Sequence, residues 1–140
     1  MDDLLTEVFT RRINCYVFVD DAGESMNRYD AAHTALATRA RHRGHNVIFM
    51  AQRGSMLSPT VRAQCERAWL FSLPQQDWYD YCQEFCCPLP LPPPPAVRGQ
   101  GVLLARYAVP VARPFRVDFT RRTFSFLPLT TPRPPTNMIT

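Results

Sequence analysis

Residues 15–24 read CYVFVDDAGE, a short apolar run that passes directly into two neighbouring aspartates, Asp20 and Asp21. The run is rich in β-branched and aromatic residues, which is typical of a strand buried on both faces, as in a parallel sheet. Two carboxylates side by side repel each other, and burial makes that repulsion more costly. The stretch therefore predicts a strand that ends at a site where a cation offsets the paired negative charge.

The segments on either side of this strand alternate between helix and strand patterns. We expect strands at 13–19, 46–51 and 67–73, and helices at 4–12, 26–43, 60–66 and 75–85. Ser25 can cap the second helix, which Gly44 ends, and Ser58-Pro59 opens the third helix with proline at its first position. The alternation indicates an α/β fold of parallel strands with flanking helices, in which ligands bind beyond the carboxyl ends of the strands. The paired aspartates and Gln52 both fall there.

The composition changes after Cys87, because 12 of the 14 prolines lie in 88–140. We divide the chain into an α/β core (1–87), a proline-rich linker (88–97), a small β extension with a possible hairpin (98–129) and a disordered tail (130–140). The sequence PLPLPPPP favours a stiff polyproline II spacer.

Charge is distributed unevenly along the chain, and all 16 cationic side chains are arginines. Residues 1–87 hold nine arginines against 11 acidic residues, whereas residues 88–140 hold seven arginines against Asp118 alone. Such a basic segment favours nucleic acid or another polyanion, and a solvated flexible end explains the charge equally well. The candidate nucleic-acid contacts are Arg98, Arg106, Arg113, Arg116, Arg121 and Arg122.

The five cysteines include no CxxC pair, and the cluster Cys82, Cys86 and Cys87 lacks a second pair at zinc-like spacing. Free or buried thiols are the simpler interpretation. The N-terminus has no signal-peptide pattern, and no apolar run is long enough to span a membrane. We therefore expect a cytoplasmic protein with reduced thiols.

The paired aspartates have three competing interpretations. In the first, Asp20 caps the turn after the strand and Asp21 faces water. In the second, the chain is a phospho-receiver domain, which needs an acceptor aspartate at the end of the third predicted strand and a lysine further on. We exclude it because that strand, 67–73, ends in Ser72 and Leu73 and the chain has no lysine.

The third interpretation is a Walker B strand, whose terminal carboxylate lies beside the phosphates of a nucleotide. Asp20 would hold Mg²⁺, and Asp21 would orient or deprotonate the attacking water. Glu24, three residues further on, could replace Asp21 as the base.

The motifs that follow favour this third interpretation. Residues 38–53 read TRARHRGHNVIFMAQR and residues 57–71 read LSPTVRAQCERAWLF. From residue 13 to about residue 85, the chain resembles the P-loop ATPases of the FtsK–HerA superfamily. It is most similar to viral and phage genome-packaging ATPases and to zonula-occludens-toxin-like phage proteins. The resemblance implies a RecA-like core, ATP and Mg²⁺ as cofactors, and a ring of identical subunits on DNA.

By position, Arg41-His42 matches the Arg-His pair of that family, and Gln52 matches its γ-phosphate sensor. Arg62 matches an arginine that acts on a neighbouring subunit. Arg53 is a second candidate for that role. Each residue also has a simpler explanation. Gln52 could cap a loop, Arg62 could pair with Glu66 at i,i+4, and His42 could cap a helix end. The aromatic residues Trp69, Phe71, Trp78 and Tyr79 are most simply core.

The resemblance breaks at the phosphate-binding loop. A P-loop needs GxxxxGK[ST], whose lysine reaches the β- and γ-phosphates, but these 140 residues contain no such spacing and no lysine. We expect the C-terminal half of an ATPase core, with an exposed apolar sheet edge and no turnover unless another chain carries the missing half. The alternative function is a non-enzymatic module that binds nucleic acid or protein, derived from such an ATPase.

Overall fold

The computed structural model describes residues 5–22, 31–87, 93–94, 96–109 and 111–128. The tail predicted at 130–140, most of the proline-rich linker and the start of the helix predicted at 26–43 lie outside these residues. No described helix is long and apolar enough to cross a membrane. In chain order the elements are η1 (Glu7–Arg11), β1 (Tyr16–Val19), α2 (Ala31–Arg39), η2 (Ala40–Arg43), β2 (Asn46–Phe49), η3 (Gly54–Met56), α3 (Pro59–Gln64), β3 (Arg67–Leu70), α4 (Gln75–Glu84), β4 (Gln100–Ala105), β5 (Ala112–Asp118) and β6 (Thr123–Phe126).

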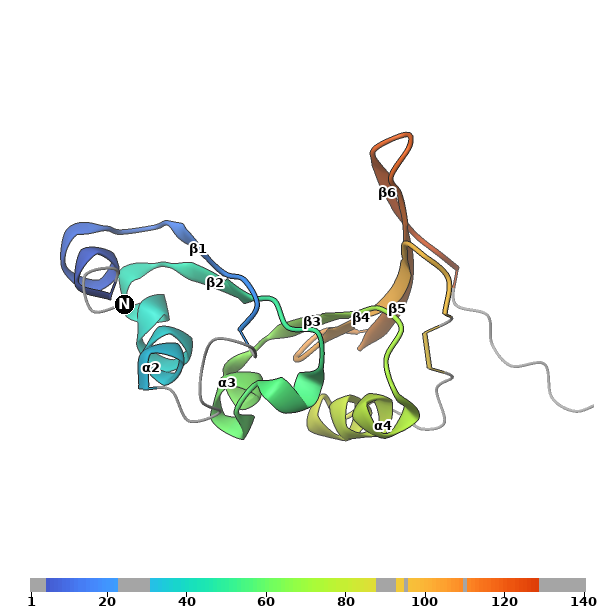
Figure 1. Cartoon of the computed structure of the whole chain (residues 1–140), viewed down its shortest axis with the longest axis horizontal. Coiled ribbons are helices and arrows are strands. Elements are labelled where there is room, and N and C mark those ends of the chain that lie inside the picture. Colours follow the sequence, from blue (N-terminus) through green and yellow to red (C-terminus); the bar gives the residue numbers. More distant parts are fainter. Residues whose placement is uncertain (1–4, 23–30, 88–92, 95, 110, 129–140) are drawn as a thin grey trace, which may run out of the picture.

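The first sheet is a parallel pair of strands, β1 and β2, as the sequence predicts. Its register aligns Tyr16 with Asn46 and Val19 with Phe49. Helix α2 covers one face of the pair (Figure 1). On that face, Val8 of η1 and Val17 of β1 form a buried cluster with α2. The predicted mixed α/β class is confirmed at this level.

The second face of the β1–β2 pair is open to solvent. Tyr16, Phe18, Ile48 and Met50 point away from α2 and are all exposed. Within the described part of the chain, no third strand pairs with β1 or β2. The prediction that residues 13–19 form a strand buried on both faces was therefore wrong, and the pair has one covered and one uncovered side.

The third predicted strand, β3, differs most from expectation. It does not extend the parallel sheet but pairs antiparallel with β4, in a four-stranded sheet of order β3-β4-β5-β6. This pairing aligns Leu70 with Val102 and places Leu104 beside them on the face that packs against Trp78 and Cys82 of α4. The antiparallel arrangement gives β3 a covered face, because α4 follows β3 and folds back beneath the sheet (Figure 1).

The predicted hairpin is present, and the structure adds one strand to it. Strands β4 and β5 pair antiparallel, and β6 adds a further strand that aligns Phe126 with Phe115. This sheet combines β3, from the predicted core, with three strands of the predicted extension.

Most of the aromatic residues predicted to be core lie at the surface. Trp78 is 1% exposed, but Trp69 and Phe71 are 48% and 47% exposed, and Tyr79 is also exposed. Successive residues of a strand point to opposite faces, so the inward side chain of Leu70 sends its two neighbours outward. The rings of Trp69 and Phe71 therefore lie on the sheet face that α4 leaves open.

Local signals place the helix ends as predicted. The Ser58 hydroxyl accepts a hydrogen bond from the Val61 N–H at 3.3 Å, which caps α3. Gly44 ends η2 in the left-handed region, with φ of 72°. The adjacent His45 is buried and hydrogen-bonds Cys15 N–H (3.2 Å) and the Val8 carbonyl (2.9 Å), which joins η1 to the first sheet.

Candidate functional site

The candidate site lies at the carboxyl edge of β1 and β2. Beyond the paired strands, the Met50 N–H donates to the Val19 carbonyl at 2.8 Å, and the Ala22 N–H donates to the Met50 carbonyl at 2.9 Å. These two bonds hold the strand ends together past the sheet. Asp20 and Asp21, which follow β1, and Gln52, which follows β2, therefore lie at the same edge, as the sequence predicts for parallel strands.

The turn after β1 presents both carboxylates to solvent. Asp21 adopts a left-handed conformation with φ of 45°, which aspartate tolerates better than most residues. Its N–H donates to Oδ1 of Asp20 at 2.9 Å, so Asp20 also has the capping role considered from the sequence. Both residues are exposed. The capping bond uses one oxygen of Asp20 and leaves its other oxygen for a further ligand.

The chemistry of this edge fits a magnesium ion held jointly with a nucleotide. Mg²⁺ usually takes one or two protein carboxylates and completes its six positions with phosphate oxygens and water. The two aspartates and the Gln52 amide supply oxygen donors of that kind. Among the described residues, no group of three or more His, Cys, Asp or Glu side chains is placed to hold a metal ion. Glu24, the alternative base, lies outside the described residues.

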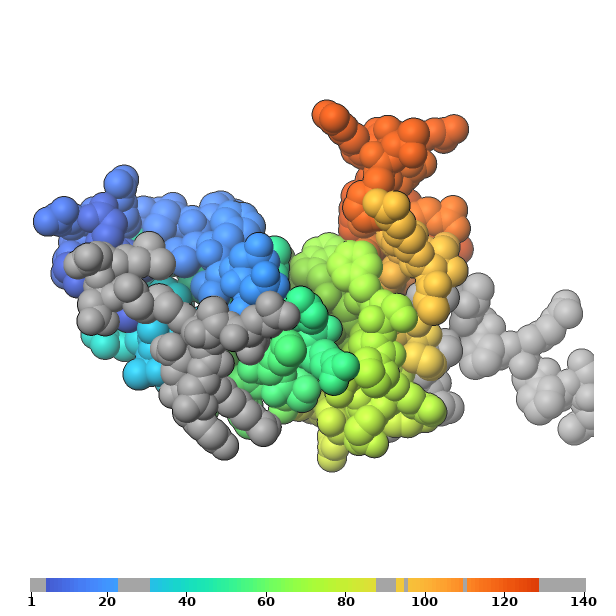
Figure 2. All heavy atoms as spheres, in the orientation of Figure 1, coloured from blue at the N-terminus to red at the C-terminus, as the bar shows by residue number. Residues whose placement is uncertain are grey.

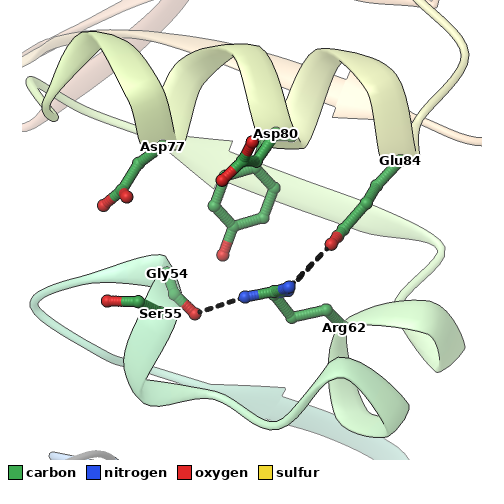
Figure 3. A pocket seen from close by; sticks show the side chains of 7 residues that line it. Gly54, Ser55, Arg62, Asp77, Asp80 and Glu84 are labelled. Atoms are coloured by element: carbon green, nitrogen blue, oxygen red, sulfur yellow. Dashed lines mark hydrogen bonds and ion pairs between the residues drawn. The ribbon is translucent and has the colours of Figure 1, made fainter.

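Arg62 has partners inside the chain (Figure 3). Its Nη2 and Nε lie 2.8 and 3.0 Å from Oε1 of Glu84 on α4, and its Nη1 donates to the Gly54 carbonyl at 3.1 Å. Its side chain is only 17% exposed. Arg62 therefore does not pair with Glu66 but links α3 to α4 and to the η3 turn. Arg53, the other candidate arginine, is exposed.

A small cavity adjoins this bridge but cannot accommodate a nucleotide. Its volume is about 20 Å³, about that of one water molecule. Burial raises the pKa of Tyr81, which lines it, to about 12. The lining residues are Gly54, Ser55, Arg62, Asp77, Asp80, Tyr81 and Glu84 (Figure 3).

The arginines predicted to contact nucleic acid do not share one surface. Arg106 is half-buried, donates to the Cys65 and Arg62 carbonyls, and stacks on Phe85 at 4.4 Å. Arg113 and Arg116 are three residues apart on β5 and so point to opposite faces of the sheet. Arg121 lies 4.0 Å from Asp118 in the turn that also holds Arg122, and Arg98 stacks on Phe119 at 5.1 Å.

The two other motifs noted in the sequence, the clustered thiols and the Arg-His pair, lie on elements other than the ends of β1 and β2. Cys82 and Cys87 are buried under the second sheet, and burial raises the pKa of both thiols, that of Cys82 to about 12. Arg41 and His42 are exposed on η2.

Comparison of the chain with known protein families, with curated proteins and with solved structures found no match in any of the three. The geometry of the described residues therefore carries the functional interpretation. That geometry also shows a surface that sequence reasoning missed, because Trp69 and Phe71 were interpreted as core. Their alternation with the inward Leu70 was the available signal for an exposed aromatic face.

Proposed function

We propose that this chain contributes half of an ATP-hydrolysis site to a DNA-translocating or genome-packaging motor with a RecA-like core. The observation that carries the proposal is the position of Asp20, Asp21 and Gln52 at one carboxyl edge of the parallel strands β1 and β2. In open α/β sheets this edge is where ligands bind. Paired carboxylates at the end of one strand and an amide at the end of the next supply the oxygen and amide groups that a magnesium nucleotide requires.

Each residue has a defined role in this proposal. Asp20 would hold Mg²⁺, and Asp21 would orient the attacking water or accept its proton, with Glu24 as the alternative base. Gln52 would hydrogen-bond the γ-phosphate. When bound, Mg²⁺ would neutralise the negative charge that develops on the transferred phosphoryl group.

The other half of the site must come from a different polypeptide segment, since residues 1–140 contain neither a lysine nor a GxxxxGK[ST] loop. The open face of the β1–β2 pair supports this requirement. Tyr16, Phe18, Ile48 and Met50 form an apolar surface that nothing in the described chain covers. A strand–loop–helix unit carrying the phosphate-binding loop would pair with the sheet edge and bury these side chains. Assembly into a ring on DNA, in the cytoplasm of a host cell or in a virion, belongs to the same proposal.

Arg53 is better placed than Arg62 to act on a neighbouring subunit. Arg53 is exposed in the segment that leaves the proposed site, whereas Arg62 would first have to leave Glu84 and the Gly54 carbonyl. An arginine of this kind stabilises the negative charge of the transition state.

Binding of Mn²⁺, a paramagnetic substitute for Mg²⁺, tests the site in the chain as it exists. In amide NMR spectra of the labelled protein, we expect Mn²⁺ to broaden the signals of 19–22 and 50–52 first. Asp20→Asn and Asp21→Asn should each remove that broadening, whereas the control Asp80→Asn, an exposed carboxylate on α4, should not. Equal broadening along α4, or unchanged broadening in Asp20→Asn, would show that the edge is only a capped turn.

A further inference from the structure

The second sheet has an exposed face lined with aromatic rings, on the side opposite α4. We call it the aromatic face and define it by Trp69, Phe71, Phe115, Phe124 and Phe126. The strand register places these rings together, because Phe115 aligns with Gly101 and Phe126, and Trp69 with Leu103. Figure 1 shows α4 on one side of β3–β5 and the β5–β6 hairpin rising on the other.

The rings form a continuous array. The centroids of Trp69 and Phe115 are 5.1 Å apart, those of Trp69 and Phe124 are 5.5 Å apart, and those of Phe124 and Phe126 are 5.1 Å apart. Phe115 is buried at the centre, and the four rings around it remain between 37% and 48% exposed. Exposed apolar patches of this kind mark binding surfaces in soluble proteins.

Positive charge accompanies the rings. The Arg113 guanidinium lies 3.8 Å from the centroid of Phe126, and Arg67, two residues before Trp69, shares its face of β3. Arg98 stacks on Phe119 in the adjoining segment. The carboxylate of Asp118 is engaged by the N–H groups of Thr120 and Arg121. By register, the described strand positions of the aromatic face hold arginine and no carboxylate.

We propose that the aromatic face binds single-stranded nucleic acid. Bases would stack on Trp69, on Phe124 and on the Arg113–Phe126 pair, while Arg67 and Arg98 contact phosphates. Aromatic rings and arginine planes stack unpaired bases of any sequence, and a basic surround attracts the backbone. Neighbouring ring centroids of the array lie 5.1–5.5 Å apart, which gives a compact platform for about two or three bases.

The charge pattern distinguishes this occupant from the alternatives. A duplex keeps its base faces stacked inside the helix, so exposed rings gain nothing from it. A second copy of this chain would bring its own arginines against these arginines. Figure 2 shows a hollow between the blue segment that contains β1 and the orange β5–β6 hairpin, with light-green residues near the end of β3 at its floor. Binding of single-stranded nucleic acid to this face needs neither ATP nor a metal ion, and so it is independent of the proposed ATPase half-site.

Fluorescence anisotropy of a labelled oligothymidylate of about 15 nucleotides tests the proposal with the full chain. We expect binding at least about tenfold tighter than to a duplex of equal length. The double variant Trp69→Ala/Phe124→Ala should weaken it by about tenfold or more, since each stacked base contributes a large share of affinity. The matched control Phe18→Ala, an exposed ring on the first sheet, should leave affinity unchanged, and circular dichroism checks that every variant is folded.

Intrinsic fluorescence gives a second readout that a lost fold does not imitate. Trp78 is buried, so a change in tryptophan emission on binding should come from Trp69. In Trp69→Phe a stacking ring remains, so affinity should persist while the emission change disappears. Tighter binding to duplex, unchanged affinity in the double variant, equal loss in Phe18→Ala, or dimerisation that the double variant abolishes would each overturn the proposal.

Discussion

Arg62 shows how a single side chain joins three separate parts of the chain. Its guanidinium contacts Glu84 on α4 and the Gly54 carbonyl of η3, while its own backbone belongs to α3. Both ionised side chains are mostly shielded from water. Removing one partner of such a pair leaves the other with an unbalanced, partly buried charge.

We therefore expect Arg62→Met to lower the free energy of unfolding by about 1–3 kcal/mol. Adding Glu84→Gln should recover part of that loss, because the orphaned charge is removed. The control Arg41→Met, at an exposed position, should change stability by less than about 0.5 kcal/mol. Urea unfolding followed by circular dichroism measures all three. Unchanged stability in Arg62→Met would contradict a structural role and favour a role on a neighbouring subunit.

The free energy of unfolding should fall at alkaline pH because the Cys82 thiol and the Tyr81 phenol are weak acids whose pKa is raised by burial. Burial raises the pKa of Cys82 from 9.0, and that of Tyr81 from 10.0, to about 12 in each case. The unfolded chain loses these protons at the ordinary values, so its ionisation favours unfolding as pH rises above about 9. The folded state keeps its full stability below that pH and loses it progressively towards pH 12.

Urea unfolding at about pH 7 and about pH 10.5 measures this loss. Cys82→Ala should be less stable at neutral pH, since it leaves a small cavity, yet should show a smaller fall between the two pH values. Cys86→Ala, at an exposed thiol, should show the same fall as the unmodified chain. An equal fall in Cys82→Ala would rule out this thiol as a source of the pH dependence.

The residues of the strand edge could be predicted, whereas the partners of Arg62 could not. Asp20, Asp21 and Gln52 follow apolar runs, and parallel pairing brings such positions to one edge whatever the rest of the fold does. Glu84 lies 22 residues from Arg62 in sequence, and only the packing of α4 against α3 and η3 brings them together. A local i,i+4 pattern therefore suggested Glu66 instead.

At the scale of elements, the order of strands and helices was predictable, but the pairing of β3 was not. An apolar run such as Arg67–Leu70 indicates a strand without specifying whether its neighbour is parallel or antiparallel. The partner, β4, comes after α4 and the proline-rich segment. Pairing with it gives Leu70, Val102 and Leu104 a common buried face on α4, which a place beside β2 would not provide.

Gly101 controls the contact between β3, β4 and β5. A Cβ atom at this position would lie 2.5 Å from both the Leu70 carbonyl oxygen and the Phe115 ring. The absence of a side chain lets that ring cover β4 and become the buried centre of the aromatic face. Gly101→Ala should therefore force the ring or the strand to shift.

We expect Gly101→Ala to cost about 1–3 kcal/mol of stability through overpacking. Combining it with Phe115→Leu should give less than the sum of the two separate losses, because the smaller side chain relieves the clash with the ring and leaves only the close approach to the Leu70 carbonyl oxygen. Thermal unfolding of the single and double variants measures the coupling. Strict additivity would show that the Phe115 ring is not the group that Gly101 accommodates.

At the scale of the whole molecule, two sheets each have one covered and one open face. Helix α2 covers the first sheet and α4 covers the second (Figure 1). The open apolar face of β1–β2 supports the proposed completion by another segment, and the aromatic face of β3–β6 supports single-strand binding. The two surfaces differ in charge and ring content, so variants in one should leave the function of the other intact.

The most direct test of the proposed half-site is phosphate release from ATP by a restored protein. Residues 1–140 would be joined to, or mixed with, the polypeptide carrying a GxxxxGK[ST] loop that we expect to be encoded beside them. We predict Mg²⁺-dependent turnover. Asp21→Asn should reduce it by about a hundredfold or more, because the variant lacks the group that positions or deprotonates the attacking water. The absence of an adjacent loop sequence, or turnover that Asp21→Asn leaves unchanged, would contradict the proposed role of the paired aspartates.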